Sequence, residues 1–132
     1  MRGLDTNVLL RLLVADDPGQ VARAKAWLRA QPQDERFLIN RIVLCELVWT
    51  LRRAYRFDRE QIADVIDRVL KSYAVVVEDD HSVEFALYLY RTTAADFSDC
   101  LLGVTNGFLG CTRTATFDQR AAELDEFELI PA

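Results

Sequence analysis

Acidic residues at three separated places in the chain are the first side chains whose type and spacing could do chemistry. Asp5 follows a very short apolar segment, and Asp118 follows a segment in which apolar and polar residues alternate. Asp96 and Asp99 lie three residues apart at the start of an apolar stretch. If the two segments are parallel strands and the stretch is a helix, the carboxyl edge of a sheet can gather all four carboxylates.

A fifth acid, Glu46, is the only charged residue between Ile42 and Trp49. Burial of a lone carboxylate is costly unless something pairs with it, so a buried Glu46 needs a partner. Arg52 or Arg53 could form a salt bridge with it, and a bound cation could also neutralise it. The sequence leaves both interpretations open.

Each of the other acids also lies at a place with an ordinary structural interpretation. Next to Asp5, Thr6 or Asn7 could simply cap the helix that follows the first strand. Asp96 could cap a later helix, with Asp99 favoured by the positive end of the helix dipole, and Asp118 could be a turn residue. Coincidence is nevertheless the weaker interpretation, because all these acids fall at strand ends or helix starts.

Four or five carboxylates packed together repel one another and raise their own pKa values, so a cation has to neutralise them. Oxygen ligands without an organised set of His and Cys favour a hard ion. We therefore expect one or two Mg²⁺ or Mn²⁺ ions.

The elements that must position these acids can be read from the hydrophobic spacing and the turn residues. Short strands are predicted at residues 1–4, 37–39, 74–77, 111–117 and 127–130. Helices are predicted at residues 7–14, 20–30, 42–55 and 58–71, then after Asp79 or Asp80, and finally from Asp96 or Ser98 to Leu109. Strands alternating with helices predict an α/β fold, in which a short central parallel sheet has helices on both faces. The third and fourth helices would form a hairpin arm.

Composition indicates a single domain over residues 1–132, because half of the 132 residues are apolar and no linker or repeat interrupts them. No apolar run is long enough to span a bilayer, so we expect a cytoplasmic protein without a membrane partner. The net charge of −5 argues against broad adhesion to nucleic acid, although bound metal would hide several carboxylates from that sum. Three cysteines without metal-ligand spacing are expected in the core: Cys45, Cys100 and Cys111.

Four motifs in order give the chain a resemblance to a known family. They are Gly3-Leu4-Asp5-Thr6-Asn7-Val8-Leu9, Cys45-Glu46-Leu47, Ala95-Asp96-Phe97-Ser98-Asp99-Cys100-Leu101 and Thr116-Phe117-Asp118. Together they resemble the PIN-domain nucleases, and particularly the VapC-type toxins of bacterial toxin-antitoxin pairs. The likeness extends from Met1 nearly to the end of the chain.

The resemblance implies a metal-dependent ribonuclease that is neutralised by a cognate antitoxin and that forms a homodimer. The residues that match the acidic quartet of the family are Asp5, Glu46, Asp99 and Asp118, with Asp96 as an additional acid. Polar positions beside the site are matched by Thr6, Asn7 and Thr116, which we expect to hydrogen-bond to the carboxylates.

On this basis we expect hydrolysis of an RNA phosphodiester. Asp5, Asp99 and Asp118 would hold Mg²⁺, and Glu46 would bind a second ion or orient the attacking water. The basic residues expected to contact RNA are Arg41, Arg52, Arg53, Arg56 and Arg113. Trp49 or Tyr55 could stack on bases, although Trp49 is equally compatible with the core.

Other functions are weighed against this one. A haloacid-dehalogenase-like phosphatase requires a second Asp two residues after its nucleophilic Asp, but this chain has Asn7 two residues after Asp5. A receiver domain requires a Lys near its late strands, and the last Lys of this chain, Lys71, comes too early. The sole histidine, His81, is more simply explained at a helix start than in acyl-enzyme catalysis. A PIN-like module that binds metal, RNA or its antitoxin without cutting remains open.

Overall fold

The computed structural model describes all 132 residues, and the chain divides into two compact units, Met1–Glu78 and Asp79–Ala132. Unit 1 contains a parallel three-stranded sheet in the order β1-β2-β3. Its strands are β1 (Arg2–Gly3), β2 (Phe37–Ile39) and β3 (Val75–Val77). In its register, Arg2 lies opposite Phe37, and Leu38 lies opposite Val76. Parallel neighbours need long crossovers, and helices supply them here.

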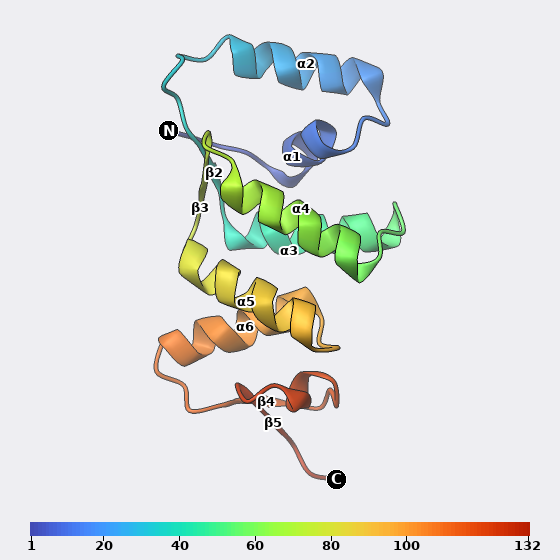
Figure 1. Cartoon of the computed structure of the whole chain (residues 1–132), viewed down its shortest axis with the longest axis vertical. Helices are drawn as coiled ribbons and strands as arrows, with labels where there is room; N and C mark the ends of the chain where they lie inside the picture. The colour runs from blue at the N-terminus through green and yellow to red at the C-terminus, as the bar shows by residue number, and fades with distance from the viewer. The chain divides into compact units, whose positions relative to one another are not determined.

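The helices of unit 1 begin and end close to the predicted positions. They are α1 (Thr6–Leu13), α2 (Pro18–Arg29), α3 (Arg41–Arg53) and α4 (Arg59–Lys71). Figure 1 shows α3 and α4 side by side and antiparallel, joined by a short turn, which is the predicted helical hairpin. Leu44, Leu47 and Leu51 from α3 and Ile62 and Ile66 from α4 are fully buried, because each set recurs at helical spacing.

Side-chain caps explain where these helices start. Asn40 accepts a hydrogen bond from the backbone N–H of Val43 at 2.9 Å, as expected, and Asp58 forms a reciprocal capping box with Gln61. At α1 the expectation was wrong. The cap is Asp5 itself, and Thr6 already belongs to the helix.

Unit 2 consists of two helices, two short parallel strands and a single 3₁₀ turn that the sequence did not predict. Its elements are α5 (Asp80–Thr92), α6 (Phe97–Phe108), β4 (Thr114–Thr116), η1 (Ala121–Glu123) and β5 (Phe127–Leu129). The two strands pair with each other, so the five strands of the chain form two hydrogen-bonded sheets. Asp79 caps α5, as one of the two expected alternatives.

The core of unit 2 lies between α5 and α6, which pack side by side (Figure 1). Tyr90 and Phe97 meet edge to face with ring centroids 5.9 Å apart, and both are almost completely buried. Cys100 is buried as expected, whereas Cys111 is exposed because it lies in the turn after α6 and not in a strand.

The predicted α/β class is confirmed, because parallel strands alternate with helices along the chain. None of the six helices has the length and apolar character required to cross a membrane.

Candidate active site

Asp5 lies between β1 and α1, and it is held there by its own capping bond. Its Oδ1 accepts a hydrogen bond from the backbone N–H of Val8 at 2.9 Å, while the residue stays exposed. One residue later, Thr6 Oγ1 donates to Glu46 Oε2 at 2.8 Å. The first turn of α1 therefore presents one acid and orients a second.

Glu46 differs from the sequence-based expectation in two ways. It is exposed rather than buried, and its hydrogen-bond partner is Thr6 rather than Arg53. The Arg53 guanidinium lies instead over the Trp49 ring, 5.1 Å from its centroid. Trp49 is 60% exposed and does not belong to the core.

A polar network fixes the other end of α1. The Arg11 guanidinium donates to Gln20 Oε1 at 2.6 Å and to Asp16 Oδ1 at 2.7 Å. Tyr55, just after α3, donates its hydroxyl to Asp16 Oδ2 at 2.5 Å. The Tyr55 hydroxyl and the Arg11 charge hold the pKa of Asp16 below its ordinary value. Helix α1 is thus tied to α3 at its start and to the segment just after α3 at its end.

The acids of unit 2 form a second group. Asp96 is the residue before α6, Asp99 lies in its first turn, and Asp118 follows β4. Burial raises the pKa of Asp99, and the neighbouring charges of Asp118 and Asp96 raise it further. A cavity of about 410 Å³ is lined by Asp96, Asp118, Gln119 and Arg120.

The turn after β4 holds Asp118 through its backbone and one carboxylate oxygen. Asp118 Oδ1 accepts from the N–H groups of Arg120 at 2.7 Å and Ala121 at 3.2 Å. Thr116 Oγ1 accepts a hydrogen bond from the Asp118 N–H at 2.9 Å. Thr116 was expected to hydrogen-bond to a carboxylate, but this bond is to the backbone and shapes the turn. The second oxygen, Oδ2, takes part in none of these three bonds.

The chemistry of these donors fits a hard divalent cation. All are carboxylates, the ligands that Mg²⁺ prefers, and the raised pKa of Asp99 marks a place where a cation would offset repulsion. Within each unit, however, no group of three or more His, Cys, Asp or Glu side chains is already gathered as a metal site.

The basic residues predicted to contact RNA have different surroundings. Arg41 forms an ion pair with Glu78, with Nε and Oε1 3.3 Å apart, and Arg53 covers Trp49. Arg52 is exposed on α3, and Arg56 is exposed in the next turn with a positive φ of 55°. Arg113 is exposed just before β4 in unit 2.

Sequence reasoning missed two groups of residues beside the acids. Gln119 and Arg120 line the cavity of unit 2. In unit 1, a groove of about 590 Å³ passes beside Asp5 and Asn7 and is lined further by Val8, Arg11, Gln20, Arg23, Ala24, Ala26 and Trp27. Helical spacing could have identified the second group, because residues 20, 23, 24 and 27 share one face of α2.

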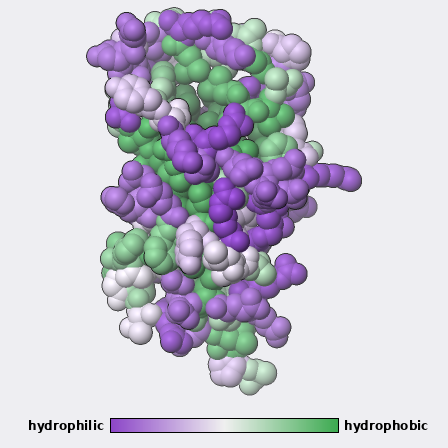
Figure 2. Space-filling model, in the orientation of Figure 1, coloured by the Kyte–Doolittle hydropathy of each residue, from purple (hydrophilic) through white to green (hydrophobic).

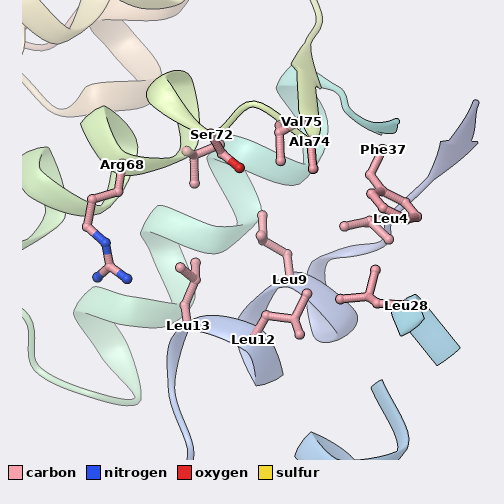
Figure 3. A pocket seen from close by; sticks show the side chains of 11 residues that line it. Leu4, Leu9, Leu12, Leu13, Leu28, Phe37, Arg68, Ser72, Ala74 and Val75 are labelled. Carbon is pink, nitrogen blue, oxygen red and sulfur yellow. The ribbon is translucent and has the colours of Figure 1, made fainter. Parts of the chain in front are cut away.

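Unit 1 also contains an apolar cavity of about 400 Å³, bounded by α1, α2, β2 and α4. Figure 3 shows leucines of α1 facing it and places Phe37 and Arg68 at opposite ends. Apolar atoms are visible in a hollow between the polar surfaces of α2 and α4 (Figure 2).

Two comparisons with known proteins agree with this arrangement. The sequence pattern of the PIN domain matches residues 4–127, nearly the whole chain. The VapC ribonuclease of Aquifex aeolicus (strain VF5) is 27% identical over 124 residues, which cover 94% of this chain and 92% of that protein. Because this match covers nearly the whole chain and its range includes Asp5, Glu46, Asp96, Asp99 and Asp118, the chain belongs to the PIN-domain family.

Proposed function

We propose that this protein is a Mg²⁺-dependent endoribonuclease and the toxin of a toxin-antitoxin pair, with residues 1–132 acting as one nuclease domain. The observation that carries the metal dependence is the gathering of three carboxylates in unit 2: burial first, and then the charges of Asp118 and Asp96, raise the pKa of Asp99, and a bound cation would offset that repulsion. The similarity to a VapC ribonuclease supports RNA as the substrate.

The acids of both units are assigned roles in this reaction. Asp5, Asp99 and Asp118 would hold the ion, and Asp96 would add negative charge beside it. Bound Mg²⁺ would supply positive charge for the phosphate and acidify an attacking water. Mn²⁺ has the same preference for oxygen ligands and should substitute for it.

Glu46 would orient the attacking water and accept its proton. The hydrogen bond from Thr6 fixes one carboxylate oxygen, which leaves the other to face water or substrate. Asn7 lies in the next position along the groove that contains Asp5, where its amide can donate to a phosphate oxygen.

The decisive experiment uses the purified chain, freed of any partner and incubated with total RNA. We expect cleavage with Mg²⁺, none with a chelator, and at least a 100-fold loss in each of Asp5→Asn and Asp99→Asn. Asp34→Asn and Asp125→Asn are matched controls, because both residues are exposed and lie outside the two acidic groups. Retained cleavage in Asp5→Asn would reject the assignment.

A binding module without catalysis is the remaining alternative. It predicts that Mg²⁺ raises the melting temperature of the wild-type chain and that RNA binds, while no new RNA ends appear. Mapping RNA ends after expression separates the two functions and also identifies the cleavage sequence.

The proposed antitoxin would dock on the apolar cavity of unit 1. The cavity is lined by leucines of α1, by Val69 of α4 and by Ser72, the residue that follows α4, with the exposed Arg68 at one end. An amphipathic segment could insert apolar side chains and pair an acid with Arg68. The lining contains none of the aromatic residues Trp27, Trp49 and Tyr55.

Co-expression with the protein encoded beside it tests this docking. Leu12→Glu should abolish co-purification, whereas Leu102→Glu, an exposed leucine of α6 in unit 2, should not. Equal co-purification of both variants would exclude the cavity as the docking site.

A further inference from the structure

The groove between α1 and α2 passes directly beside Asp5, and the proposed reaction uses only the wall that carries Asp5 and Asn7. One wall is the face of α2 that carries Gln20, Arg23 and Trp27. The small side chains of Ala24 and Ala26 lie between them and leave the groove open to a flat or extended ligand. The opposite wall includes Asn7 of α1 and Asp5, the residue that caps this helix.

The groove is held in shape before any ligand binds. Arg11 of α1 donates from Nε to Gln20 Oε1 of α2 at 2.6 Å, so the two walls are joined at one end. Gln20 also lies in the first turn of α2, where its N–H donates to the capping Asp17. A groove that is already held in shape binds a ligand at a lower ordering cost.

Arg23 is the cation of this groove that is available to a ligand. Arg11 is already engaged with Asp16 and Gln20, whereas the exposed Arg23 makes no ion pair or hydrogen bond through its side chain. In a protein of net charge −5, an unpaired guanidinium beside a catalytic carboxylate points to an anionic ligand.

Trp27 provides an aromatic surface one helical turn further along α2. Its ring packs against Phe37 with centroids 5.9 Å apart, which orients it, and the residue is still 41% exposed. Residues four apart on a helix are separated by about 6 Å along its axis. Arg23 and Trp27 can therefore contact the phosphate and the base of neighbouring nucleotides.

We propose that this groove binds single-stranded RNA next to the cleaved bond, with Arg23 on a phosphate and Trp27 stacked on a base. The proposal rests on the proposed ribonuclease function and adds a subsite to it. Single-stranded RNA is favoured because its bases are free to stack on aromatic side chains, whereas a paired helix hides them. The cation and the exposed ring also suit RNA better than an apolar peptide.

The test measures the binding of a fluorescein-labelled single-stranded RNA to variants that also carry Asp99→Asn. This substitution is expected to prevent cleavage, and Asp99 does not line the groove. Arg23→Gln should weaken binding and reduce the slope of log K against log salt by about 0.7, the value for one lost phosphate contact with a single strand. Trp27→Ala should weaken binding by about 5-fold to 100-fold, with little change of slope.

Arg29→Gln is the matched control, because it removes the same charge from an exposed position of α2 that does not line the groove. Trp27→Leu keeps an apolar contact with Phe37 and replaces Trp27→Ala if the alanine variant unfolds. Wild-type affinity and slope in Arg23→Gln would overturn the subsite alone. Absence of RNA binding by the Asp99→Asn chain would overturn the proposed function itself.

Antitoxin binding is a separate outcome. If Arg23→Gln and Trp27→Leu weaken co-purification with the antitoxin but leave RNA affinity unchanged, the groove belongs to the protein partner and the RNA subsite is wrong.

Discussion

Glu46 depends on a single hydrogen bond for its orientation, because it is exposed and its recorded partner is the Thr6 hydroxyl. Thr6→Val keeps the shape of the side chain and removes the donor. We expect cleavage to fall at least 10-fold in kcat with little change in melting temperature, since an exposed hydrogen bond adds only about 1 kcal/mol.

Thr6→Ser, which restores the hydroxyl, is the control for this variant. Recovery of most of the activity would show that the donor matters more than the methyl group. Full activity in Thr6→Val would show that the bond to Glu46 has no catalytic consequence.

Asp99 should make stability depend on pH and on metal in a distinctive way. Its pKa in the folded chain is raised, first by burial and then by Asp118 and Asp96, so the ionised form is destabilising at neutral pH. This cost disappears as pH falls through the raised pKa, because the folded state takes up the proton first. Asp99→Asn should therefore melt higher than the wild type at pH 7 without metal.

The measurement is a pair of melting curves at pH 7 and near pH 4. The advantage of Asp99→Asn should shrink at the lower pH, and Mg²⁺ should raise the melting temperature of the wild type more than that of the variant. An advantage that is the same at both pH values would contradict the electrostatic origin.

At the level of single residues, the sequence identified the acids but not how they are held. Thr6 or Asn7 was expected to cap α1, yet the Asp5 carboxylate itself caps this helix and stays exposed. Glu46 was expected to be buried because its neighbours are apolar, but it lies on the exposed side of α3. Residue type shows what chemistry is possible, whereas orientation depends on contacts between segments far apart in sequence.

Helix α6 contains two glycines with opposite expected behaviour. A Cβ at Gly103 would lie 2.6 Å from Phe127 Cε2 and 2.9 Å from Glu126 Cβ, whereas a Cβ at Gly107 would meet nothing within 4 Å. Gly103→Ala should destabilise the protein by about 1–3 kcal/mol through overpacking against β5. Gly107→Ala should stabilise it by about 0.5–1 kcal/mol.

Denaturant unfolding of the two variants provides the comparison, and each serves as the control for the other. If Gly103→Ala were as stable as the wild type, the close packing of α6 on Phe127 would be wrong.

The network at the end of α1 allows a test of how α1 is tied to α3. Tyr55→Phe removes the hydroxyl that contacts Asp16 and Arg11 and should lower the melting temperature by roughly 2–4 °C. The pKa of Asp16 is lowered in the folded chain, so its contribution is present at neutral pH and is lost as pH falls through that lowered value. The difference between variant and wild type should therefore shrink in acid.

Tyr73→Phe is the matched control, because Tyr73 is 92% exposed and its hydroxyl takes part in no such network. Equal effects of the two substitutions would show that the Tyr55 bonds add nothing to stability.

At the scale of elements, sequence patterns located every helix and strand within a few residues, because apolar spacing and caps are local. The 3₁₀ turn at η1 was missed, since three residues are too few for a period. Cys111 was placed in a strand because its neighbours alternate, but Gly110, with φ of 100°, starts a turn there, and β4 begins only at Thr114.

For the whole molecule, we expect the homodimer that the family resemblance implies. Ile42 and Trp49 lie seven residues apart on one face of α3 and are 68% and 60% exposed. Large exposed apolar side chains commonly mark protein interfaces, and a two-fold dimer uses the same patch on both chains. Ile42→Glu should convert the dimer to a monomer.

Light scattering after size exclusion measures this directly against the chain mass of 15.1 kDa. Tyr73→Glu, a charge placed at a still more exposed apolar ring outside α3, is the control. A wild-type chain that is monomeric at every concentration would contradict the expected dimer.

The α/β class of the whole molecule was predictable from the sequence, but the pairing of its strands was not. Alternating strands and helices indicated parallel sheets, yet strand order and the separation into β1-β2-β3 and β4-β5 depend on long-range hydrogen bonds. The grooves and cavities were equally inaccessible, because each is lined by several elements at once.

The register of β1 with β2, and of β2 with β3, also has a consequence for how the chain acquires activity during synthesis. Residues 2–3 pair with residues 37–38, and residues 37–39 pair with residues 75–77, so the sheet of unit 1 cannot close until both helical crossovers have been made. Unit 1 can then fold on the ribosome while the segment that carries Asp99 and Asp118 is still inside the exit tunnel. Such a nascent chain would present Asp5 and Glu46 without the remaining acids, and the proposed nuclease would stay inactive until Asp118 had emerged.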